Sequence, residues 1–262
     1  MKEIRLELNK SNYNDFIRCL QNLKDICNDV QIDNGIIRQR NNENTAIFEF
    51  DMSAILSDVS LTLTDIKQKL DLLKTFQDTQ DVQIYVSEPE DEEKEGPGFF
   101  EFSDTFSSIR CMAPNQKYID NKFITLEELT NISSFDESDL ILERELSNII
   151  TNRMRVVSTN FNVKSIRIDF QGETASITAA TQAKSESAKF ITGIPINEII
   201  IQNSFSNIPV IPFCIDHDTA IEFKMFKEKA PSSGNTVTNK ISTTLGQVDI
   251  KIFSRSSILT EE

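Results

Sequence analysis

The single histidine of the chain is the first residue to consider for chemistry. His217 lies between Asp216 and Asp218, a combination that could suggest a metal site or acid–base catalysis. If this stretch were a strand, alternation would place both aspartates on the face opposite the histidine. No second cluster of metal-ligating residue types accompanies it in the sequence. We therefore interpret the stretch as a turn and expect no metal.

Other catalytic signatures are also missing from the sequence. It contains no Gly-x-Ser-x-Gly motif, no phosphate-binding loop and no Gly-x-Gly-x-x-Gly motif. Cys19, Cys27, Cys111 and Cys214 show no Cys-x-x-Cys pairing, so we expect buried free thiols. The sequence therefore predicts a protein that is not an enzyme and has no cofactor.

Positively charged side chains recur on the polar faces of three expected helices. Arg144 and Arg155 belong to a stripe with Asn148 and Thr151 at spacings of three or four, and Lys67 and Lys74 lie two turns apart on one face. Arg18 shares a face with Gln21 and Asn22, and Lys24 lies nearer the edge of that face. Such side chains can neutralise phosphates without reading bases, which gives sequence-independent and salt-sensitive binding of duplex DNA. The cations that we expect to face DNA are Arg18, Lys24, Lys67, Lys74, Arg144 and Arg155.

The net charge of −14 argues against a conventional nucleic-acid binder if the charge is evenly spread. The charge is uneven, because six acids and a single lysine crowd the stretch from Glu88 to Glu95. We interpret this run as a solvated loop. If sheets lie outside and helices inside, the acids decorate the exterior and the bases gather on one surface.

Length and composition are those of a soluble globular protein. The 262 residues can form one large domain or two of ordinary size, and hydrophobic and charged residues make up 39% and 26%. No apolar run approaches the roughly 20 residues that span a membrane. The N-terminal residues alternate like a strand and lack the apolar segment of a signal peptide. We expect an intracellular protein without membrane contact.

Residues 1–112 predict the order β-α-β-β-β twice. Ile4, Leu6 and Leu8 alternate with polar residues as in a strand, and Ser11 is a suitable N-cap for the helix that follows. The predicted strands then fall within 29–52, near 61–63, at 82–86 and within 98–112, and the second helix spans 64–76.

The second half repeats this order less clearly. Residues 129–135 suggest a weak strand, and residues 136–158 suggest a helix capped by Asp136. A strand pair follows from residue 165, and a fourth helix within 206–219 is interrupted by Pro209 and Pro212. The pattern therefore predicts an α+β protein of two similar domains, 1–112 and 129–262, joined by a connector, 113–128.

These repeats resemble the DNA sliding clamps, the family represented by proliferating cell nuclear antigen and the clamps of tailed phages. Three stretches carry the resemblance besides the repeats: FIRCLQNLKDICNDVQIDNGI (16–36), APNQKYIDNKF (113–123) and DIKIFSRSSILTEE (249–262). The resemblance covers essentially the whole chain. It implies a closed ring, usually a trimer for subunits of this length, with sheets outside and helices lining a channel for duplex DNA.

The resemblance also implies partner and subunit contacts. DNA polymerase and the clamp loader would dock short peptides in a pocket beneath the connector, formed by Phe123, Ile124, Leu126, Ile252, Phe253 and Ile258. Ring closure would pair the edge strands 107–112 and 174–181, through Ser107, Ser108, Ile109, Arg110, Thr174, Ser176 and Thr178.

The sequence departs from the family at several positions. The fourth helix is poorly defined, and Asn41 stands where cellular relatives often carry an apolar pocket residue. The helices carry fewer bases than many cellular clamps, which favours a phage-type clamp in an infected or prokaryotic cell over a nuclear one. The alternatives are a ring-forming or virion β-rich protein that does not bind DNA, and a subunit of a checkpoint-type heterotrimer.

Overall fold

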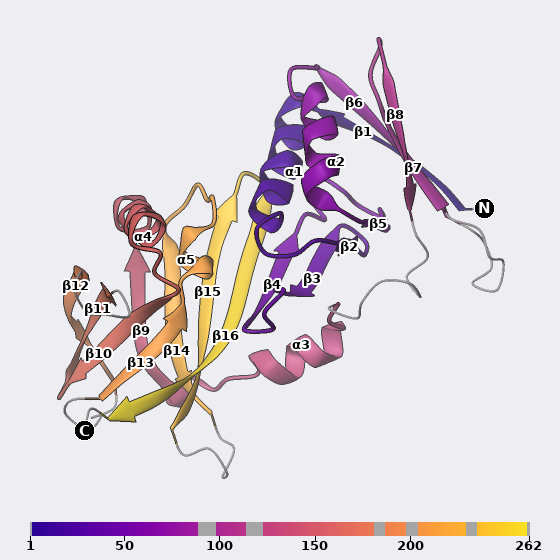
Figure 1. Ribbon diagram of the computed structural model, residues 1–262. Helices are drawn as coiled ribbons and strands as arrows, with labels where there is room; N and C mark the ends of the chain where they lie inside the picture. Colours follow the sequence, from indigo (N-terminus) through magenta and orange to yellow (C-terminus); the bar gives the residue numbers. More distant parts are fainter. Residues whose placement is uncertain are drawn as a thin grey trace. The chain divides into compact units, whose positions relative to one another are not determined.

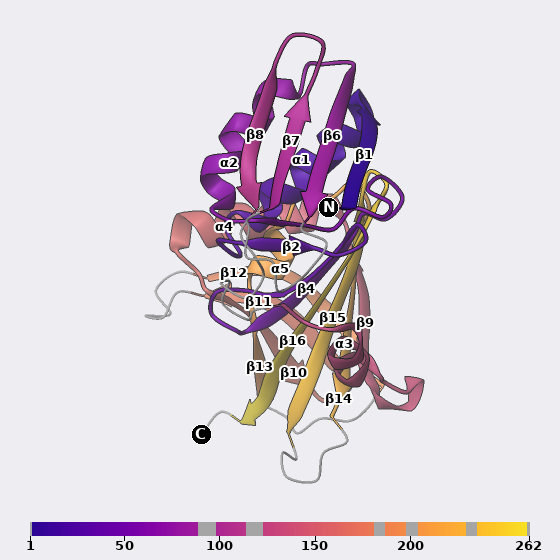
Figure 2. The same ribbon diagram turned by 90° about the vertical axis from the view of Figure 1, so that its right-hand side faces the viewer.

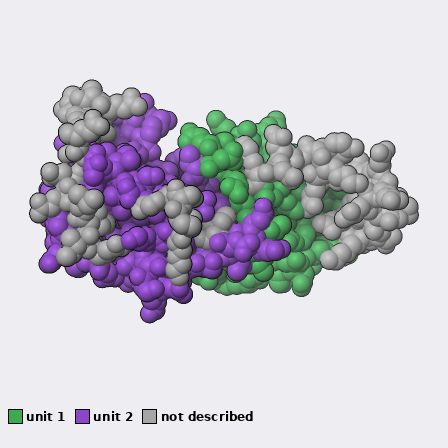
Figure 3. Space-filling model, turned by 90° about the horizontal axis from the view of Figure 1, so that it is seen from below, with its two compact units in different colours: residues 1–44, 48–126, 244–250 green, residues 45–47, 127–243, 251–262 purple. Residues whose placement is uncertain are grey.

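The computed structural model describes residues 2–88, 98–113, 123–180, 187–197, 204–228 and 235–260. The acidic stretch 89–97, residues 114–122 of the expected connector and the tail residues Glu261 and Glu262 lie outside these ranges. The chain forms two compact units (Figure 3). Unit 1 comprises Met1–Asn44, Phe48–Leu126 and Thr244–Ile250, and unit 2 comprises Thr45–Ile47, Glu127–Thr243 and Lys251–Glu262.

The first half of the chain contains two consecutive β-α-β-β-β segments. Their elements are β1 (Lys2–Asn9), α1 (Lys10–Leu23), β2 (Val30–Ile32), β3 (Ile36–Arg40), β4 (Ala46–Asp51), β5 (Leu61–Leu63), α2 (Ile66–Leu73), the 3-10 turn η1 (Lys74–Phe76), β6 (Asp81–Glu88), β7 (Gly98–Ser103) and β8 (Ser108–Ala113).

The second half repeats the same order after a short additional helix. Its elements are α3 (Leu126–Ser133), the 3-10 turn η3 (Glu137–Asp139), β9 (Leu140–Leu146), α4 (Asn148–Phe161), β10 (Ser165–Gln171), β11 (Thr174–Ala180), β12 (Ser187–Pro195), β13 (Ser204–Pro209), α5 (Ile211–Cys214), β14 (Ile221–Lys227), β15 (Thr236–Leu245) and β16 (Val248–Thr260). The α+β class and the internal repeat are therefore confirmed.

In unit 1, α1 and α2 lie side by side on one face of an antiparallel sheet with the order β1-β6-β7-β8 (Figures 1 and 2). The core between them is aromatic. The Tyr13 ring lies 6.5 Å from that of Phe76 and 6.4 Å from that of Phe102, and Phe16 stacks on Phe102 at 6.0 Å. The buried Tyr13 hydroxyl donates to the Leu73 carbonyl at 2.8 Å. This hydrogen bond ties the first helix to the end of the second.

Helix α1 begins two residues before the predicted position. Asn9 is the N-cap, and its side-chain oxygen accepts a hydrogen bond from the Asn12 backbone N–H at 2.9 Å. Ser11, the predicted cap, lies in the first turn. Asparagine and serine satisfy the free N–H groups of a helix start about equally well, so sequence preference alone did not separate them.

In unit 2, the described strands form an antiparallel path with the order β12-β11-β10-β13-β16-β15-β14-β9. Helices α4 and α5 lie next to one another on one face of this sheet (Figure 1). Their burial differs from that of α1, because α4 buries only Thr151, Met154 and Ser158, whereas α1 buries seven residues.

The predicted helix 136–158 is wrong in its first half. Asp136 caps the turn η3 through a capping box rather than a helix, and residues 140–146 form strand β9. Leu142 and Leu146 are both fully buried on this strand. A spacing of four residues satisfies the helical period and also strand alternation, so these two leucines fit either structure. Residues 129–135, predicted as a strand, belong mainly to helix α3.

The fourth helix exists, but it is a single turn. Pro209 is the last residue of β13, and Pro212 lies in the first turn of α5, where its missing N–H has no helical partner to lose. Helix α5 has four residues, whereas α2 at the same place in the first repeat pair has eight and continues into η1. The second unit therefore has less helical cover than the first.

Candidate functional site

The structure places four of the six expected DNA-facing cations on the helical layer of unit 1. Arg18 lies on α1, half-buried, with Nη1 4.0 Å from Asp15 Oδ1. Lys24 is the C-cap residue of α1, Lys67 is exposed on α2, and Lys74 opens the turn η1. The ion pair with Asp15 offsets part of the Arg18 charge. The remaining three are lysines at the solvent boundary of two neighbouring helices.

Of the two cations expected on the helix of unit 2, only Arg155 lies on a helix. It is exposed on α4, and one N–H of its guanidinium donates to Asn152 Oδ1 at 2.8 Å. Arg144 lies instead on strand β9, opposite Phe223 of β14, and is exposed there. The expected stripe through Arg144 and Arg155 therefore does not exist, since the helix begins only at Asn148.

A second arginine on α4 was missed by the sequence analysis. Arg153 is exposed two residues before Arg155. Counting the helical period from Asn148 instead of from Asp136 places Arg153 on the solvent side, four residues after Ile149 and three before Val156. The helical position of Arg153 could be read from the sequence. The helix predicted from Asp136 instead included Arg144, which lies outside α4.

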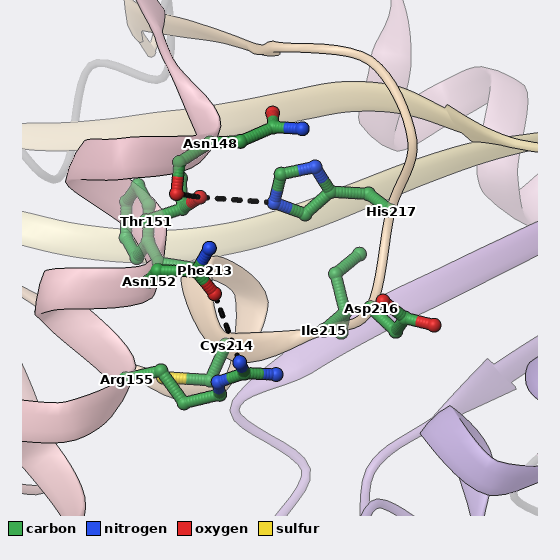
Figure 4. Close-up of a pocket in the computed structure, with 9 residues that line it drawn as sticks. All are labelled: Asn148, Thr151, Asn152, Arg155, Phe213, Cys214, Ile215, Asp216 and His217. Atoms are coloured by element: carbon green, nitrogen blue, oxygen red, sulfur yellow. Dashed lines mark hydrogen bonds between the residues drawn. The ribbon is translucent and has the colours of Figure 1, made fainter.

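A polar pocket of about 230 Å³ lies beside α4, and we call it the α4 pocket (Figure 4). Helix α4 supplies one wall, and the segment from Phe213 to His217 supplies the other. The lining residues are Asn148, Thr151, Asn152, Arg155, Phe213, Cys214, Ile215, Asp216 and His217. Arg155, which we expected to face DNA, and His217, which we expected in a turn, therefore line the same pocket.

Three hydrogen bonds fix the segment after α5 against its surroundings. His217 Nδ1 lies 2.8 Å from the Thr219 carbonyl oxygen, and His217 Nε2 lies 3.1 Å from Thr151 Oγ1 on α4. The Asn148 side-chain amide donates to the Asp218 carbonyl at 3.2 Å. Both ring nitrogens of the histidine are thus engaged in positioning, and segment 216–219 is irregular, as the turn interpretation requires.

Cys214 lies at the floor of the α4 pocket and is a poor nucleophile. Burial raises the pKa of its thiol to about 11, and the hydrogen bond with Ser158 and the nearby Arg155 charge lower it only in part. The thiolate fraction at neutral pH is therefore very small. Among the described residues, no group of three or more His, Cys, Asp or Glu side chains has the arrangement of a metal site.

The edges of the two sheets are the second candidate feature. Strand β8 ends the order β1-β6-β7-β8 and carries Ser108, Ile109 and Arg110, while Ser107 lies in the preceding turn and donates its N–H to Asp104 at 2.7 Å. Among the described strands, β8 is therefore an edge strand, as expected for residues 107–112.

The edge expected at residues 174–181 is wrong. Thr174, Ser176 and Thr178 lie on β11, which pairs with β10 on one side and β12 on the other. The end strand is β12 (Ser187–Pro195). The sequence predicts a strand in this stretch, but the edge position of β12 depends on pairing with β11 that the local pattern does not encode. Strand β12 contains register shifts against β11, and Gly193 has a φ of +67°.

Strand β9 at the other end of this path is partly covered. The Asn197 backbone N–H donates to the Ile141 carbonyl at 2.8 Å, and its side-chain amide donates to the Leu140 carbonyl at 3.2 Å. Two of the carbonyl groups at the start of β9 are therefore occupied, which leaves β12 as the more accessible edge of unit 2.

Exposed apolar side chains lie on the helices beside these two edges. Ile149 and Val156 are 65% and 55% exposed on α4, the helix that neighbours β11 and β12. In unit 1, Leu72 on α2 is 45% exposed and lies one turn from Lys69, whose Nζ sits 5.6 Å from the Phe100 ring centroid and near Cys111 of β8. Each edge strand thus has an apolar helix surface beside it.

The residues expected to form a partner-peptide pocket differ strongly in exposure. Ile124 is buried, and Ile252 and Phe253 of β16 are 1% and 3% exposed. Since Ile252 and Phe253 are consecutive on a strand, their side chains point to opposite faces. Among the same set, Phe123 and Ile258 are half-buried and Leu126, at the start of α3, is 60% exposed. Ile252 and Phe253 are therefore core residues rather than pocket surface.

Comparison with known proteins identifies the architecture. No protein-family model and no curated protein matches the chain. Among solved structures, proliferating cell nuclear antigen of Entamoeba histolytica matches with a TM-score of 0.60 and 11% identity, over 97% of this chain and 98% of that one. The complex of PCNA2 and PCNA3 from Sulfolobus tokodaii matches with a TM-score of 0.59 and 10% identity, over 97% and 99%.

A third match carries a bound peptide. The A. fulgidus PCNA bound to the C-terminal region of FEN-1 has a TM-score of 0.56 and 11% identity, over 98% of this chain and all of that one. Identities near one residue in ten support a shared fold and not a shared activity. No helix among the described residues is both long and apolar enough to cross a membrane.

Proposed function

We propose that this chain, which has the PCNA-like sliding-clamp fold, is a sliding clamp that encircles duplex DNA and tethers a replication polymerase. Copies of the chain close into a ring, most simply a homotrimer, and the protein performs no chemistry itself. Its role is to increase the length copied per binding event. We further propose that it serves a phage-type or prokaryotic replication system and acts inside the cell.

The observation that carries this proposal is that the fold likeness extends over the whole length of both chains. A chain that matches PCNA structures over 97–98% of its residues retains both repeat pairs and both sets of helices and sheets. The clamps that these repeats resemble build closed rings from such duplicated units. The duplication of β-α-β-β-β segments therefore supports assembly rather than a single binding site.

Ring closure is proposed to pair β8 of one copy with β12 of the next. Both strands end their sheets among the described residues, and an edge strand offers unpaired backbone groups to a neighbour. A head-to-tail contact of this kind uses two different surfaces, so it closes into a ring if the rotation between copies fits. The strand that we first expected, β11, has no free side to offer.

The same contact is proposed to cover the exposed apolar side chains of the neighbouring helices. Leu72 lies on α2, the helix that carries Lys69 near Cys111 of β8, and Ile149 and Val156 lie on α4, the helix that contacts β12. If the two strands of adjacent copies pair, α2 of one copy and α4 of the next come close, and these side chains leave water together. Burial of such side chains stabilises by roughly 1.5–3 kcal/mol each.

The DNA-facing surface is proposed to consist of the helical layers of both units. Its cations are Arg18, Lys24, Lys67 and Lys74 in unit 1 and Arg153 and Arg155 on α4 in unit 2. Arg144 is not included because it lies on a strand. This density is low, and low density suits a protein that must hold DNA without fixing its position. Partner peptides are proposed to contact the exposed Leu126 on α3.

The test combines native mass with retention on DNA. Light scattering of the purified protein should give a multiple of the 29.8 kDa subunit mass, with a trimer expected. After loading, the ring should remain on circular duplex DNA and slide off the same DNA once it is made linear. A ring that shows no such difference supports the alternative of a structural ring without DNA function. A lone monomer at high concentration contradicts self-assembly and favours a heterotrimer.

A further inference from the structure

The α4 pocket arises because the second helix of unit 2 is cut short. In unit 1, the flank of α1 faces α2 and η1, eleven residues of continuous helix and turn. In unit 2, the corresponding cover is the four-residue α5, followed by the irregular segment from Ile215. The part of α4 that carries Asn148, Asn152 and Arg155 therefore faces only the short α5 and the segment that follows it, and it borders the pocket.

Two hydrogen-bond donors are directed by their surroundings toward this pocket. The Arg155 guanidinium has five N–H donors in a planar fork, and one of them is held by Asn152 Oδ1 at 2.8 Å. That hydrogen bond also fixes the Asn152 amide, whose nitrogen is left as a donor. Figure 4 shows both side chains on α4 among the residues that line the pocket. A guanidinium fork with an adjacent amide suits the oxygen atoms of an oxyanion.

The opposite wall is held in place before any ligand arrives. The hydrogen bonds of His217 to Thr151 and Thr219, and of Asn148 to the Asp218 carbonyl, fasten the segment after α5 to α4. A site whose walls are already fixed loses little conformational entropy on binding.

The charged groups around the pocket favour an anion on balance. Arg155 lies at the opening, and the one acidic side chain among the lining residues is Asp216. Figure 4 shows the Asp216 carboxylate pointing away from the labelled side chains of α4. At about 230 Å³, the pocket is larger than the roughly 30 Å³ of one water and smaller than the pockets of about 300–1,000 Å³ that hold drug-sized ligands.

We infer that the α4 pocket binds a single phosphate group, with Arg155 and Asn152 as donors and His217 as the fixed wall. This inference rests on the proposed function for the source of that phosphate. In a ring with its helices around DNA, the group is a backbone phosphate of the encircled duplex. The chemistry of the pocket would serve a free phosphate ion equally well, so the two sources must be separated by experiment.

The first experiment uses inorganic phosphate and needs no ring and no DNA. Because His217 is the single histidine, its ring gives one unambiguous set of NMR signals in the full-length protein. Adding sodium phosphate at constant pH and ionic strength should shift these signals along a saturating curve, whereas sodium chloride should not. A shift that is equal with both salts, or that does not saturate, overturns the inference.

The matched variants are Arg155→Gln and Arg153→Gln, two arginines on the same exposed helix. Arg155→Gln should weaken phosphate binding about tenfold or more, as expected for loss of a charged donor. Arg153→Gln should leave the curve unchanged, because Arg153 is not among the lining residues. Asn152→Ala should weaken binding less. Equal effects of the two arginine variants would mean that general surface charge, and not the pocket, attracts the ion.

The second experiment identifies the source of the phosphate with a short duplex DNA oligomer. If the group belongs to DNA, Arg155→Gln should reduce the dependence of duplex binding on salt concentration by about one phosphate contact per subunit. If the salt dependence of duplex binding is the same in Arg155→Gln as in the parent protein, the site serves free phosphate only, and its link to DNA is refuted. A protein that binds phosphate but forms no ring would refute the proposed function and leave the pocket standing.

Discussion

At the scale of single residues, the buried Tyr13 hydroxyl and the partly buried Cys214 thiol have different roles. The Tyr13 hydroxyl is a structural donor that joins the two helices of unit 1, and burial raises the pKa of Tyr13 above its usual value. The Cys214 thiol lines the α4 pocket but is kept protonated by its surroundings. Neither residue requires a catalytic interpretation, and each makes a separate prediction.

Replacing Tyr13 with phenylalanine should destabilise the protein without changing its assembly. The substitution keeps the aromatic contacts with Phe76 and Phe102 but leaves the buried Leu73 carbonyl without its donor. The cost should be about 1–3 kcal/mol in the free energy of unfolding, measured by urea denaturation. Tyr85→Phe serves as the control, since Tyr85 is only half-buried. Equal stability of Tyr13→Phe and the parent protein would contradict the role of this hydrogen bond.

Alkylation of Cys214 should be slow at neutral pH and should accelerate as the pH rises toward 11. The thiolate is the reactive species, and a pKa of about 11 leaves only a small fraction of it at pH 7 to 8. Iodoacetamide labelling followed by peptide mass spectrometry gives the rate. The urea-unfolded protein, in which the thiol is in water, is the control. Rapid labelling of the native protein at pH 7 would show that Cys214 is not buried as described.

At the scale of elements, the turn between β15 and β16 depends on a position that accepts only glycine. Gly246 has a φ of +56°, and a Cβ atom placed there would collide with the Asp15 carboxylate of α1. Asp15 in turn accepts a hydrogen bond from the Gln247 N–H at 3.3 Å. The turn is thereby held against the first helix of the chain by one buried acid.

Gly246→Ala should therefore destabilise unit 1 by more than about 1 kcal/mol, because strain in φ and the collision with Asp15 act together. Gly172→Ala is the matched control. Gly172 also has a positive φ, +67°, but nothing lies within 4 Å of its added Cβ. Thermal unfolding of both variants measures the difference. A loss no greater in Gly246→Ala than in Gly172→Ala would remove the contact with Asp15 from the explanation.

The element order of unit 1 could be predicted from sequence because its strands and helices have distinct periods. Phe48, Phe50 and Met52 fit alternation alone, and Phe16, Leu20 and Leu23 fit the helical period alone. The start of β9 could not be predicted, since Leu142 and Leu146 fit both. Which strand lies at the edge of a sheet depends on pairing between distant segments, and the local pattern of residues 174–180 carries no such information.

The candidate site was predictable only in part. Spacing identified Arg155, and composition identified His217, but they lie in different parts of the sequence and were given unrelated roles. Their proximity follows from α4 and α5 packing side by side, and from the shortness of α5. Pro209 and Pro212 indicated that the fourth helix would be interrupted. They did not indicate which residues would lie beside α4 in place of a longer helix.

At the scale of the whole molecule, assembly should depend on the exposed apolar residues beside the sheet edges. Ile149→Asp together with Val156→Asp should raise the dissociation constant of the ring at least about tenfold, because charged groups would replace buried apolar area. Sedimentation at several protein concentrations measures this change. Leu126→Asp, at a residue exposed to a similar degree on α3, should leave the mass unchanged and reduce binding of partner peptides.

An assembly that keeps its mass in the Ile149→Asp, Val156→Asp variant would place the subunit contact elsewhere. The same variant should fold normally, since both side chains are already mostly in water in the single chain. Circular dichroism and thermal unfolding provide that check. A change in mass without a change in fold would then assign the effect to the contact between copies.

If the proposed ring forms around DNA, the single-turn α5 makes the two halves of each subunit unequal in their helical lining. A ring of three subunits with equal halves would present six equivalent helical surfaces to a duplex that rotates once inside it. In the proposed trimer, with one short helix in each subunit, the inner wall would repeat only three times and would alternate between a fuller and a thinner helical lining. The resistance of such a ring to rotation of its DNA would then repeat three times per turn. The number of chains, and not the number of domains, would set this periodicity.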